Sequence, residues 1–370
     1  MNKILCANFN ECASCVLDGD YRAQKELKIE RTRQILKPFY DGEIEFFASA
    51  LSGFRSRAEL RLWHNENGLN YAMNKADKRP VIIQNCAIVD EKIADLMPKL
   101  LARLNENFKL KERVFGVEFV TSCDEICVIL LYHKDILSIE DELSELFRAL
   151  KISVVARSRG KKLVFGSEIL NESLKIAGEI FKYKISFDGF IQPNRAINEK
   201  MITYVCKKIK KQKRRDFLEL YCGHGNFTLP LARHFNAVLA SEINKTSIAL
   251  SKQNAILNGA ENIKFIRMGA DELISAFKGR EYKRLKDIRL KDYDFSHILV
   301  DPPRAGCSQD VLMMMKDYEN IIYVSCSQES LARDLGLLEP THRIENLALF
   351  DQFAHTNHIE TIAVLSKQKY

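Results

Sequence analysis

Hydrophobic and polar positions follow two different rhythms along the chain. Between residues 217 and 365, short apolar runs recur, and most of the early ones are followed by a turn and a helical stretch such as Thr228–Phe235 or Lys245–Leu257. We expect seven strands there: Phe217–Tyr221, Ala237–Ser241, Ile263–Arg267, His297–Val300, Ile321–Ser325, Asn346–Phe350 and Glu360–Leu365. Strands that alternate with helices predict a doubly wound α/β fold with a mostly parallel sheet. The loop between the last two strands is too short for a helical crossover, so these two should pair antiparallel.

Residues 37–186 lack this rhythm and predict a separate α+β unit. Its expected strands are Ala58–Trp63, Val114–Thr121 and Ile126–His133, and its expected helices are Lys92–Glu106 and Glu140–Leu150. Tyr21–Leu36 is dense in Lys, Arg and Glu and predicts a solvated helix. We therefore divide the chain into an N-terminal cysteine segment with a helix (1–36), an α+β domain (37–186) and an α/β domain (187–370).

Composition narrows the class of protein without identifying it. The 370 residues are 46% hydrophobic and 28% charged, as in a globular protein of about two domains. The net charge of +7 permits an anionic partner but does not require one. No apolar run approaches the ~20 residues that span a bilayer, and the N-terminus lacks a secretory signal. We expect a cytoplasmic protein without membrane contact, whose ten cysteines are reduced.

A glycine-rich turn follows the first strand of the α/β domain. Tyr221-Cys222-Gly223-His224-Gly225-Asn226 opens a helix, and Glu242 ends the next strand, 19 residues after Gly223. This offset is close to that of the acidic residue that meets ribose hydroxyls in dinucleotide folds. The third glycine of a pyrophosphate-binding loop is missing, so a nucleoside without phosphates, such as S-adenosylmethionine (SAM), fits better. An ordinary turn is the alternative.

Three reactive side chains occupy the ends of the later strands. Asp301 follows one strand, Cys326 follows the next, and Glu360 begins the last, beside apolar residues that could raise its pKa. The position at the rim of the sheet makes Cys326 a candidate nucleophile and Glu360 a candidate proton-transfer group. Taken singly, Asp301 could be a helix cap and Cys326 an inert buried thiol.

Four strings together resemble the RNA 5-methyluridine (uracil-5) methyltransferase family. They are Arg55–His64, Leu130–Lys134, Phe190–Asn194 and Phe350–Glu360. The resemblance implies a C-terminal class I SAM-dependent methyltransferase domain, with a Rossmann-like seven-stranded sheet, and an N-terminal α+β RNA-binding domain. It also implies that Cys326 is the nucleophile, that Glu360 is the base, and that SAM is contacted by Gln192, Tyr221, Asn226, Glu242 and Asp301.

The activity implied by the resemblance is methylation of carbon 5 of a uridine in the T-loop of tRNA. The thiolate adds to carbon 6, carbon 5 takes the methyl group, and the base removes the carbon 5 proton. Other T-loop-like RNA could be accepted, and no protein partner is inferred. The alternatives are 23S rRNA as the substrate, or a non-catalytic RNA-binding or folding protein. The expected RNA contacts are Arg55, Arg57, Arg61, His133, Phe54 and Trp63.

Four cysteines near the N-terminus form a separate motif. Cys6, Cys12 and Cys15 are spaced as C-x5-C-x2-C, and Cys86 follows after 70 residues. Four thiolates can hold an iron–sulfur cluster or a zinc ion. The spacing resembles the motif of rRNA-modifying relatives that carry a [4Fe–4S] cluster, which favours the rRNA alternative. The cysteines could also be unligated.

Overall fold

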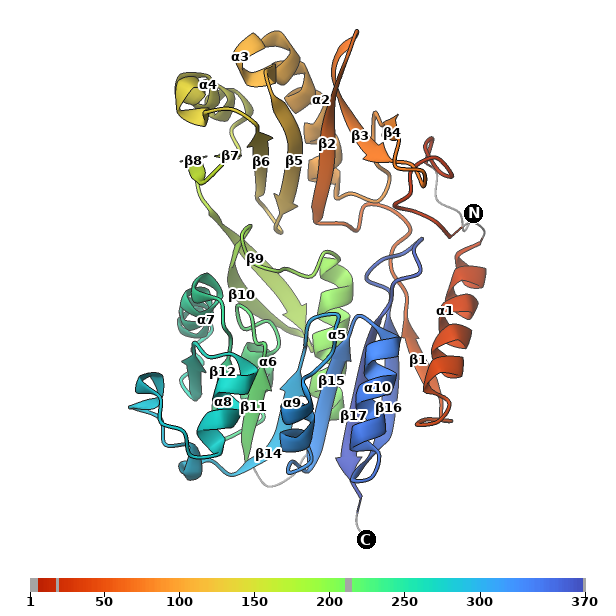
Figure 1. Ribbon diagram of the computed structural model, residues 1–370, viewed down its shortest axis with the longest axis vertical. Helices are drawn as coiled ribbons and strands as arrows, with labels where there is room; N and C mark the ends of the chain where they lie inside the picture. Colours follow the sequence, from red (N-terminus) through yellow and green to blue (C-terminus); the bar gives the residue numbers. More distant parts are fainter. Residues whose placement is uncertain (1–5, 18–19, 210–214, 369–370) are drawn as a thin grey trace.

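Two sheets, one above the other in Figure 1, organise the chain. The computed structural model describes residues 6–17, 20–209 and 215–368. The C-terminal sheet has the strand order β1-β16-β17-β15-β14-β11-β12-β13. Its strands are β1 (Ile44–Phe47), β11 (Asp216–Leu220), β12 (Val238–Ser241), β13 (Ile263–Ile266), β14 (Phe295–Val300), β15 (Asn320–Ser325), β16 (His342–Phe350) and β17 (Glu360–Lys367). All seven expected strands are present, and β16 and β17 pair antiparallel as predicted. Every other pair is parallel except β15 with β17.

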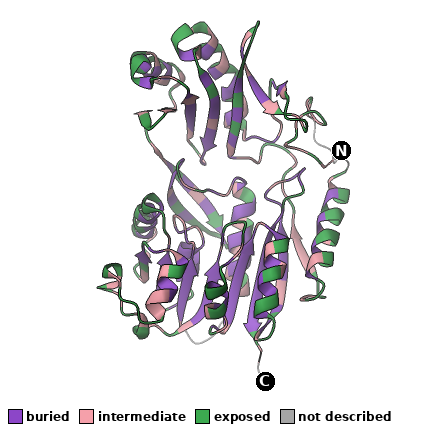
Figure 2. Cartoon of the chain, in the orientation of Figure 1, coloured by how far each residue is buried: buried purple, intermediate pink, exposed green. Residues whose placement is uncertain are grey.

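Helices cover both faces of the C-terminal sheet because successive strand residues point to opposite sides. One core contains Phe217 and Leu299 with α5 (Arg195–Lys208), α6 (Thr228–Ala232) and α7 (Lys245–Leu257). The other contains Leu218 and Ile298 with α8 (Ala270–Phe277), α9 (Gln309–Met315) and α10 (Gln328–Leu338). Figure 2 shows the buried sheet in purple between helices with exposed outer surfaces. The predicted α/β class is confirmed.

The N-terminal sheet has seven strands in the order β4-β3-β2-β5-β6-β7-β8. They are β2 (Arg57–Asn65), β3 (Gly68–Asn74), β4 (Pro80–Ile82), β5 (Val114–Thr121), β6 (Ile126–Tyr132), β7 (Ser153–Ser158) and β8 (Lys161–Phe165). The helices of this unit are α2 (Glu91–Glu106), α3 (Phe108–Lys111) and α4 (Glu140–Leu150). The apolar side chains of α2 and α4 pack on one face of the sheet. The other face carries polar and aromatic residues, since alternate positions of β2 are exposed.

Two elements from residues 37–186 pack differently from the sequence prediction. β1 is the edge strand of the C-terminal sheet, parallel to β16, and does not join the α+β sheet. The hairpin of β9 (Ile169–Ile176) and β10 (Glu179–Ser186) lies between the two units (Figure 1). Its Lys182 and Lys184 backbone N–H groups donate to the side chains of Asn258 and Asn254 at 2.9 and 2.7 Å. The hairpin is therefore fastened to α7 of the C-terminal unit.

Helix α1 (Tyr21–Leu36) has the predicted bounds and an exposed outer face, but one side of it is packed against the C-terminal unit, which the sequence analysis did not predict. Gln24, Lys28, Thr32 and Leu36 are buried at a spacing of four residues. Because three of these four side chains are polar, the helix shows no apolar stripe that would reveal its buried face.

Short 3-10 helices lie at Ile136–Ile139, Lys283–Leu285 and Leu290–Asp292. In the described chain, no helix is long and apolar enough to cross a membrane.

Candidate active site at the rim of the C-terminal sheet

One cavity of about 870 Å³ lies at the carboxyl ends of β11, β12, β14 and β15. Ligands of open α/β sheets bind at this edge, and the volume lies within the range of cofactor sites. Its lining includes all seven residues predicted for the reaction and the cofactor: Gln192, Tyr221, Asn226, Glu242, Asp301, Cys326 and Glu360. The fold thus brings together side chains that are up to 168 residues apart in the sequence, since 360 − 192 = 168.

The glycine-rich turn after β11 has a backbone that most residues could not adopt. Tyr221, Gly223 and Gly225 have φ angles of 61°, 56° and 91°. A Cβ atom on Gly225 would lie 3.5 Å from Leu229 and 3.6 Å from Phe265, so the turn is also closely packed there. A non-glycine residue with positive φ, such as Tyr221, is typical of functional sites. The turn lets the backbone approach a ligand in the cavity.

Glu242 is fixed at the end of β12 by two backbone N–H donors. Gly223 N donates to its Oε2 at 3.1 Å and Asn244 N donates to its Oε1 at 2.8 Å. Asn244 in turn caps α7 by accepting from the Ser247 N–H at 2.9 Å. The carboxylate is half-buried and lines the cavity beside the glycine turn. Its remaining lone pairs can accept hydrogen bonds from the hydroxyls of a ribose.

The side chains of Gln192 and Asn226 border the cavity near the start of α5. Asn226 and Asn198 of α5 exchange reciprocal side-chain hydrogen bonds at 2.9 Å, and the backbone carbonyl of Asn226 accepts from the Tyr183 hydroxyl at 3.1 Å. Gln192 Oε1 is buried and has no hydrogen-bond partner in the part of the chain that the structure describes. A buried acceptor without a partner is costly, so this oxygen fits the donor of a bound ligand.

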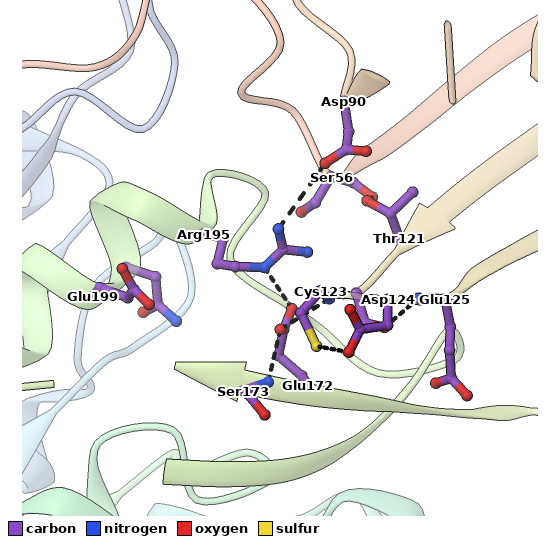
Figure 3. A network of polar contacts seen from close by, with 12 residues as sticks. Ser56, Asp90, Thr121, Cys123, Asp124, Glu125, Glu172, Ser173, Arg195 and Glu199 are labelled. Atoms are coloured by element: carbon purple, nitrogen blue, oxygen red, sulfur yellow. Dashed lines mark hydrogen bonds and ion pairs between the residues drawn. The ribbon is translucent and has the colours of Figure 1, made fainter. Parts of the chain in front are cut away.

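Arg195 ties this part of the cavity to the N-terminal unit (Figure 3). Its Nε donates to Glu172 Oε2 at 2.8 Å, and its Nη1 lies 4.0 Å from Asp90 Oδ2. Glu172 Oε1 accepts from the backbone N–H of Cys123 at 3.1 Å. Asp90 and Cys123 belong to the α+β unit, Glu172 to β9, and Arg195 to the first turn of α5. This network holds the segment that carries Gln192 between the two units.

The thiol and the carboxyl group of the predicted reaction lie on adjacent strands. Cys326 follows the last residue of β15, Ser325, which pairs with Thr361 of β17, and Glu360 directly precedes Thr361. Burial raises the pKa of Glu360 to about 8, and the Asp301 carboxylate adds to the shift. Burial, followed by Glu360 and Asp301, raises the pKa of the Cys326 thiol to about 11. Arg304, which also lines the cavity, acts in the opposite direction on the thiol but does not offset these effects, so both groups are mostly protonated at neutral pH.

Glu219 is a fourth acidic group of the cavity, which the sequence analysis did not single out. It is 1% exposed, and its Oε2 has no hydrogen-bond partner among the described residues. Burial raises its pKa to about 8 and the pKa of Asp301 to about 7. A charged residue inside the otherwise apolar strand Phe217–Leu220 was the available signal. Three carboxyl groups with raised pKa values fit a cationic ligand, because its charge would favour their ionised forms.

The four N-terminal cysteines surround a second, smaller cavity of about 80 Å³. Arg55 lines both this cavity and the larger one, so the two adjoin. Burial raises the pKa of Cys15 to about 12, with Cys86, Cys12 and Cys6 acting in the same direction. The donor set fits an iron–sulfur cluster in number and softness. Among residues 6–17, 20–209 and 215–368, however, no group of three or more His, Cys, Asp or Glu side chains is arranged to hold a metal ion.

A groove of about 920 Å³ runs over the open face of the N-terminal sheet. Of the expected RNA contacts, its lining includes Arg55, Arg61, Trp63 and His133. Arg57 instead pairs with Glu118 at 3.0 Å. The lining also includes Phe115, whose ring stacks on His133 at 3.9 Å between centroids. The sequence analysis missed Phe115, although its position between apolar neighbours in β5 leaves it exposed.

Comparison with known proteins gives a consistent set of similarities. The family model described as tRNA (Uracil-5-)-methyltransferase matches residues 20–368. The tRNA/tmRNA (uracil-C(5))-methyltransferase of Campylobacter hominis is 47% identical over 363 residues, which cover 98% of this chain and 99% of that protein. Its counterpart from Sulfurovum sp. is 45% identical over 371 residues, covering 99% and 100% of the two chains.

A solved structure has the same fold. The crystal structure of the Pyrococcus abyssi tRNA (uracil-54, C5)-methyltransferase in complex with S-adenosyl-L-homocysteine superimposes with a TM-score of 0.70. The match covers 94% of this chain and 83% of that one, at 22% sequence identity. The similarity supports the two-unit architecture of Figure 1, with a class I methyltransferase sheet and a second sheet domain at the N-terminal end.

Proposed function

The chain belongs to the tRNA (uracil-5-)-methyltransferase family, and from this premise we propose that it methylates carbon 5 of a uridine in the T-loop of tRNA, with SAM as the methyl donor. The relatives' names also include tmRNA, which we propose as a second substrate. One observation carries the mechanism: a thiol, a buried carboxyl group and the glycine-rich turn line one cavity.

Cys326 and Glu360 have complementary roles in the proposed reaction. The Cys326 thiolate forms a bond to carbon 6 of the uracil, and the electron pair of the C5–C6 double bond moves into an enolate. Carbon 5 then takes the methyl group that the sulfonium of SAM supplies. Glu360 accepts the proton from carbon 5, the double bond re-forms, and the bond to Cys326 breaks. Before the first step the thiol loses its proton to solvent, which the pKa of about 11 makes unfavourable. The positive charge of Arg304, and that of the SAM sulfonium when it is bound, favours the thiolate.

We propose an orientation for SAM in the cavity from the groups that line it. Glu242 would accept hydrogen bonds from the ribose hydroxyls, since two backbone donors fix its carboxylate beside the glycine turn. Gln192 Oε1 would accept from the ligand's amino groups, and Asn226 and Tyr221 would border it. Asp301 would lie near the reacting pair in the same cavity, because its charge acts on both Cys326 and Glu360.

The groove over the N-terminal sheet supports binding of a structured RNA loop. Exposed aromatic rings can stack on bases and guanidinium groups can contact phosphates, as in other RNA-binding sheets. Arg61 lies 5.5 Å from the ring of Trp63, so cationic and stacking groups are interleaved. The target uridine must leave the stack to reach Cys326, as in other base-modifying enzymes. Arg55 lines both the groove and the reaction cavity and connects them.

Transfer of tritiated methyl groups from SAM tests this function. We expect 5-methyluridine in the T-loop of unmodified tRNA, and no product with Cys326→Ala. A Cys326→Ala protein that still binds SAM serves as the control for folding. Product in 23S rRNA alone would assign the substrate to the rRNA alternative, and no product in either RNA would favour the non-catalytic RNA-binding alternative.

For the cysteine cavity we propose a [4Fe–4S] cluster held by Cys6, Cys12, Cys15 and Cys86. The support is that four thiols, the ligands such clusters require, line one cavity. Because no three of them are arranged as metal ligands among the described residues, the thiols would have to draw together around the cluster. The N-terminal segment is already held near the larger cavity, because the Val16 and Leu17 N–H groups, next to Cys15, donate to the His355 carbonyl at 2.9 and 3.0 Å. The cluster would add a second attachment of this segment, through Cys86. Iron and sulfide analysis with visible absorption on anaerobically purified protein tests this. Cys15→Ser should abolish the absorption, whereas Cys123→Ser should leave it unchanged; zinc or no metal would contradict it.

A further inference from the structure

Lys28 of helix α1 and Asp351 form an ion pair that is nearly shielded from solvent. Lys28 Nζ lies 2.6 Å from Asp351 Oδ1, and the two side chains are 2% and 1% exposed. The Tyr21 hydroxyl donates to the other carboxylate oxygen, Oδ2, at 2.6 Å, and itself accepts from the Ser49 N–H at 2.9 Å. Both oxygens of Asp351 are therefore held by groups of helix α1, which is far from Asp351 in the sequence.

The pair fixes the loop 351–359, which connects β16 to β17. Lys28 Nζ also donates to the Phe353 carbonyl at 3.2 Å, so one ammonium group bridges two points of the loop. Farther along, His355 has a φ of 66°, its N–H donates to Gln24 Oε1 at 3.2 Å, and its Nε2 lies 2.8 Å from the Leu51 carbonyl oxygen. Helix α1 thus contributes Gln24 and Lys28 from one buried stripe to the same loop.

This loop leads directly to Glu360 and forms part of the cavity wall. Its Phe353, Thr356, His358 and Ile359 line the cavity together with Glu360. The Thr356 hydroxyl donates to the same Phe353 carbonyl at 2.8 Å, and the His358 N–H donates to the Thr356 hydroxyl at 3.1 Å. A continuous chain of hydrogen bonds therefore runs from Lys28 through Phe353 and Thr356 to the residue two positions before Glu360.

Stability alone does not account for a buried ion pair. Apolar residues of similar volume often stabilise a fold as well or better, because burying two charges costs solvation free energy. A fixed geometry is what a buried pair can add. We propose that Lys28 and Asp351 are positioning residues that hold the loop 351–359 so that the Glu360 carboxylate faces the carbon 5 proton; this inference rests on the proposed function.

The proposal separates two steps of the reaction. Bond formation between Cys326 and carbon 6, and methyl transfer to carbon 5, precede the step that needs Glu360. If Glu360 is displaced, the methylated RNA stays bonded to Cys326, because its carbon 5 proton is not removed. Loss of the pair should therefore slow turnover and let a methylated covalent adduct accumulate. A merely structural defect would lower turnover and adduct together.

The test compares Lys28→Met with Arg31→Met in the full chain. Arg31 lies on the same helix and pairs with the exposed Glu329 of α10 at 2.7 Å. Its charge also acts on His358, but in the described chain its side chain makes no hydrogen bond to the loop 351–359. We expect Lys28→Met to lower turnover on tRNA at least 10-fold, to leave the KM for SAM within about 2-fold, and to accumulate tritiated, denaturation-resistant protein–RNA adduct as Glu360→Gln does. Arg31→Met should change each quantity less than 2-fold.

Other variants keep the inference testable if Lys28→Met does not fold. Asp351→Asn keeps the size of the side chain, and Tyr21→Phe removes only one hydrogen bond; both should show the same adduct in smaller amount. Turnover in these variants equal to that of Arg31→Met, or turnover and adduct lost together with SAM binding retained, would overturn the positioning role. Absence of product and adduct with the wild-type protein would instead reject the proposed function.

Discussion

Glu242 Oε2 accepts a hydrogen bond from the Gly223 backbone N–H at 3.1 Å, so the carboxylate at the end of β12 is fixed to the glycine turn after β11. If this carboxylate holds the ribose, Glu242→Ala should raise the KM for SAM about 10-fold or more, the cost of hydrogen bonds to a charged group. The turnover number should change little, because the ribose is remote from the reacting atoms. Initial rates at varied SAM and saturating tRNA measure both.

The control for Glu242 is Asn244→Ala, which removes the cap of α7 but leaves the carboxylate. This variant should lower thermal stability with a smaller effect on the KM for SAM. If both variants lose SAM affinity equally, the role of Glu242 is to shape the loop and not to bind the ribose.

Gly225 should resist substitution because of its backbone conformation, since an added Cβ would make only ordinary contacts. Its φ of 91° strains any other residue, and an added Cβ would be in contact with Leu229, Phe265 and Ser251. Gly225→Ala should therefore destabilise the fold by about 1–2 kcal/mol and weaken SAM binding. Gly279→Ala, at a φ of 97° with open space around the Cβ, should show similar strain with normal SAM binding. Thermal unfolding with and without SAM distinguishes the two, and equal SAM affinity would contradict a role of the Gly225 turn in binding.

The open sheet face offers a test of the RNA surface. Trp63 and Phe115 are 37% and 39% exposed in the groove, whereas Phe108 is 71% exposed on α3. Because base stacking contributes about 1–3 kcal/mol per base, Trp63→Ala and Phe115→Ala should each raise the KM for tRNA about 10-fold. Their KM for SAM should be unchanged, and Phe108→Ala should resemble wild type in both. Methylation rates at varied tRNA measure this; no change for either groove variant would place RNA elsewhere.

The sequence predicts which residues stand at the rim of the C-terminal sheet, but it does not predict the contacts that hold the neighbouring loop in place. Asp301, Cys326 and Glu360 stand at strand ends that hydrophobic periodicity defines, so their convergence follows from the topology of a parallel sheet. Lys28 gave no such signal: its partner Asp351 is 323 residues away, and its helix shows no apolar stripe. Long-range polar contacts of this kind have no local pattern.

The edge strand β1 and the hairpin β9–β10 illustrate the same limit. Residues 44–47 (Ile-Glu-Phe-Phe) are too few to show a pattern that assigns them to either sheet, and only their pairing with 347–350 of β16 places them in the C-terminal one. The hairpin is held to α7 by the side chains of Asn254 and Asn258. Neither contact follows from periodicity, because strand partners are chosen by tertiary packing.

The raised pKa of Glu360 predicts how the rate depends on pH. As the base, Glu360 must be ionised, and burial raises its pKa to about 8. The turnover number on tRNA should therefore fall about 10-fold for each pH unit below 8 and level off above that value, because the step that needs Glu360 follows methyl transfer. The ratio kcat/KM, which covers the steps up to methyl transfer, should instead rise toward pH 11 as the Cys326 thiol ionises. Rates from pH 6 to 10 at constant ionic strength measure the profile, and Glu360→Gln should lack the step near 8.

Asp301→Asn tests whether the charge of Asp301 contributes to the raised pKa of Glu360. The Asp301 carboxylate, whose own pKa is about 7, is ionised at pH 8 and raises the pKa of both Glu360 and Cys326. Removing its charge should lower the pKa of Glu360, so the rise in rate that reports this group should move to lower pH. Weaker SAM binding would lower the rate at every pH but would not move the pH at which the rate rises. A step that stays in place would mean that burial alone sets the pKa of Glu360. A step that moves to higher pH would mean that Asp301 stabilises the ionised base, contrary to the like-charge repulsion that this geometry implies.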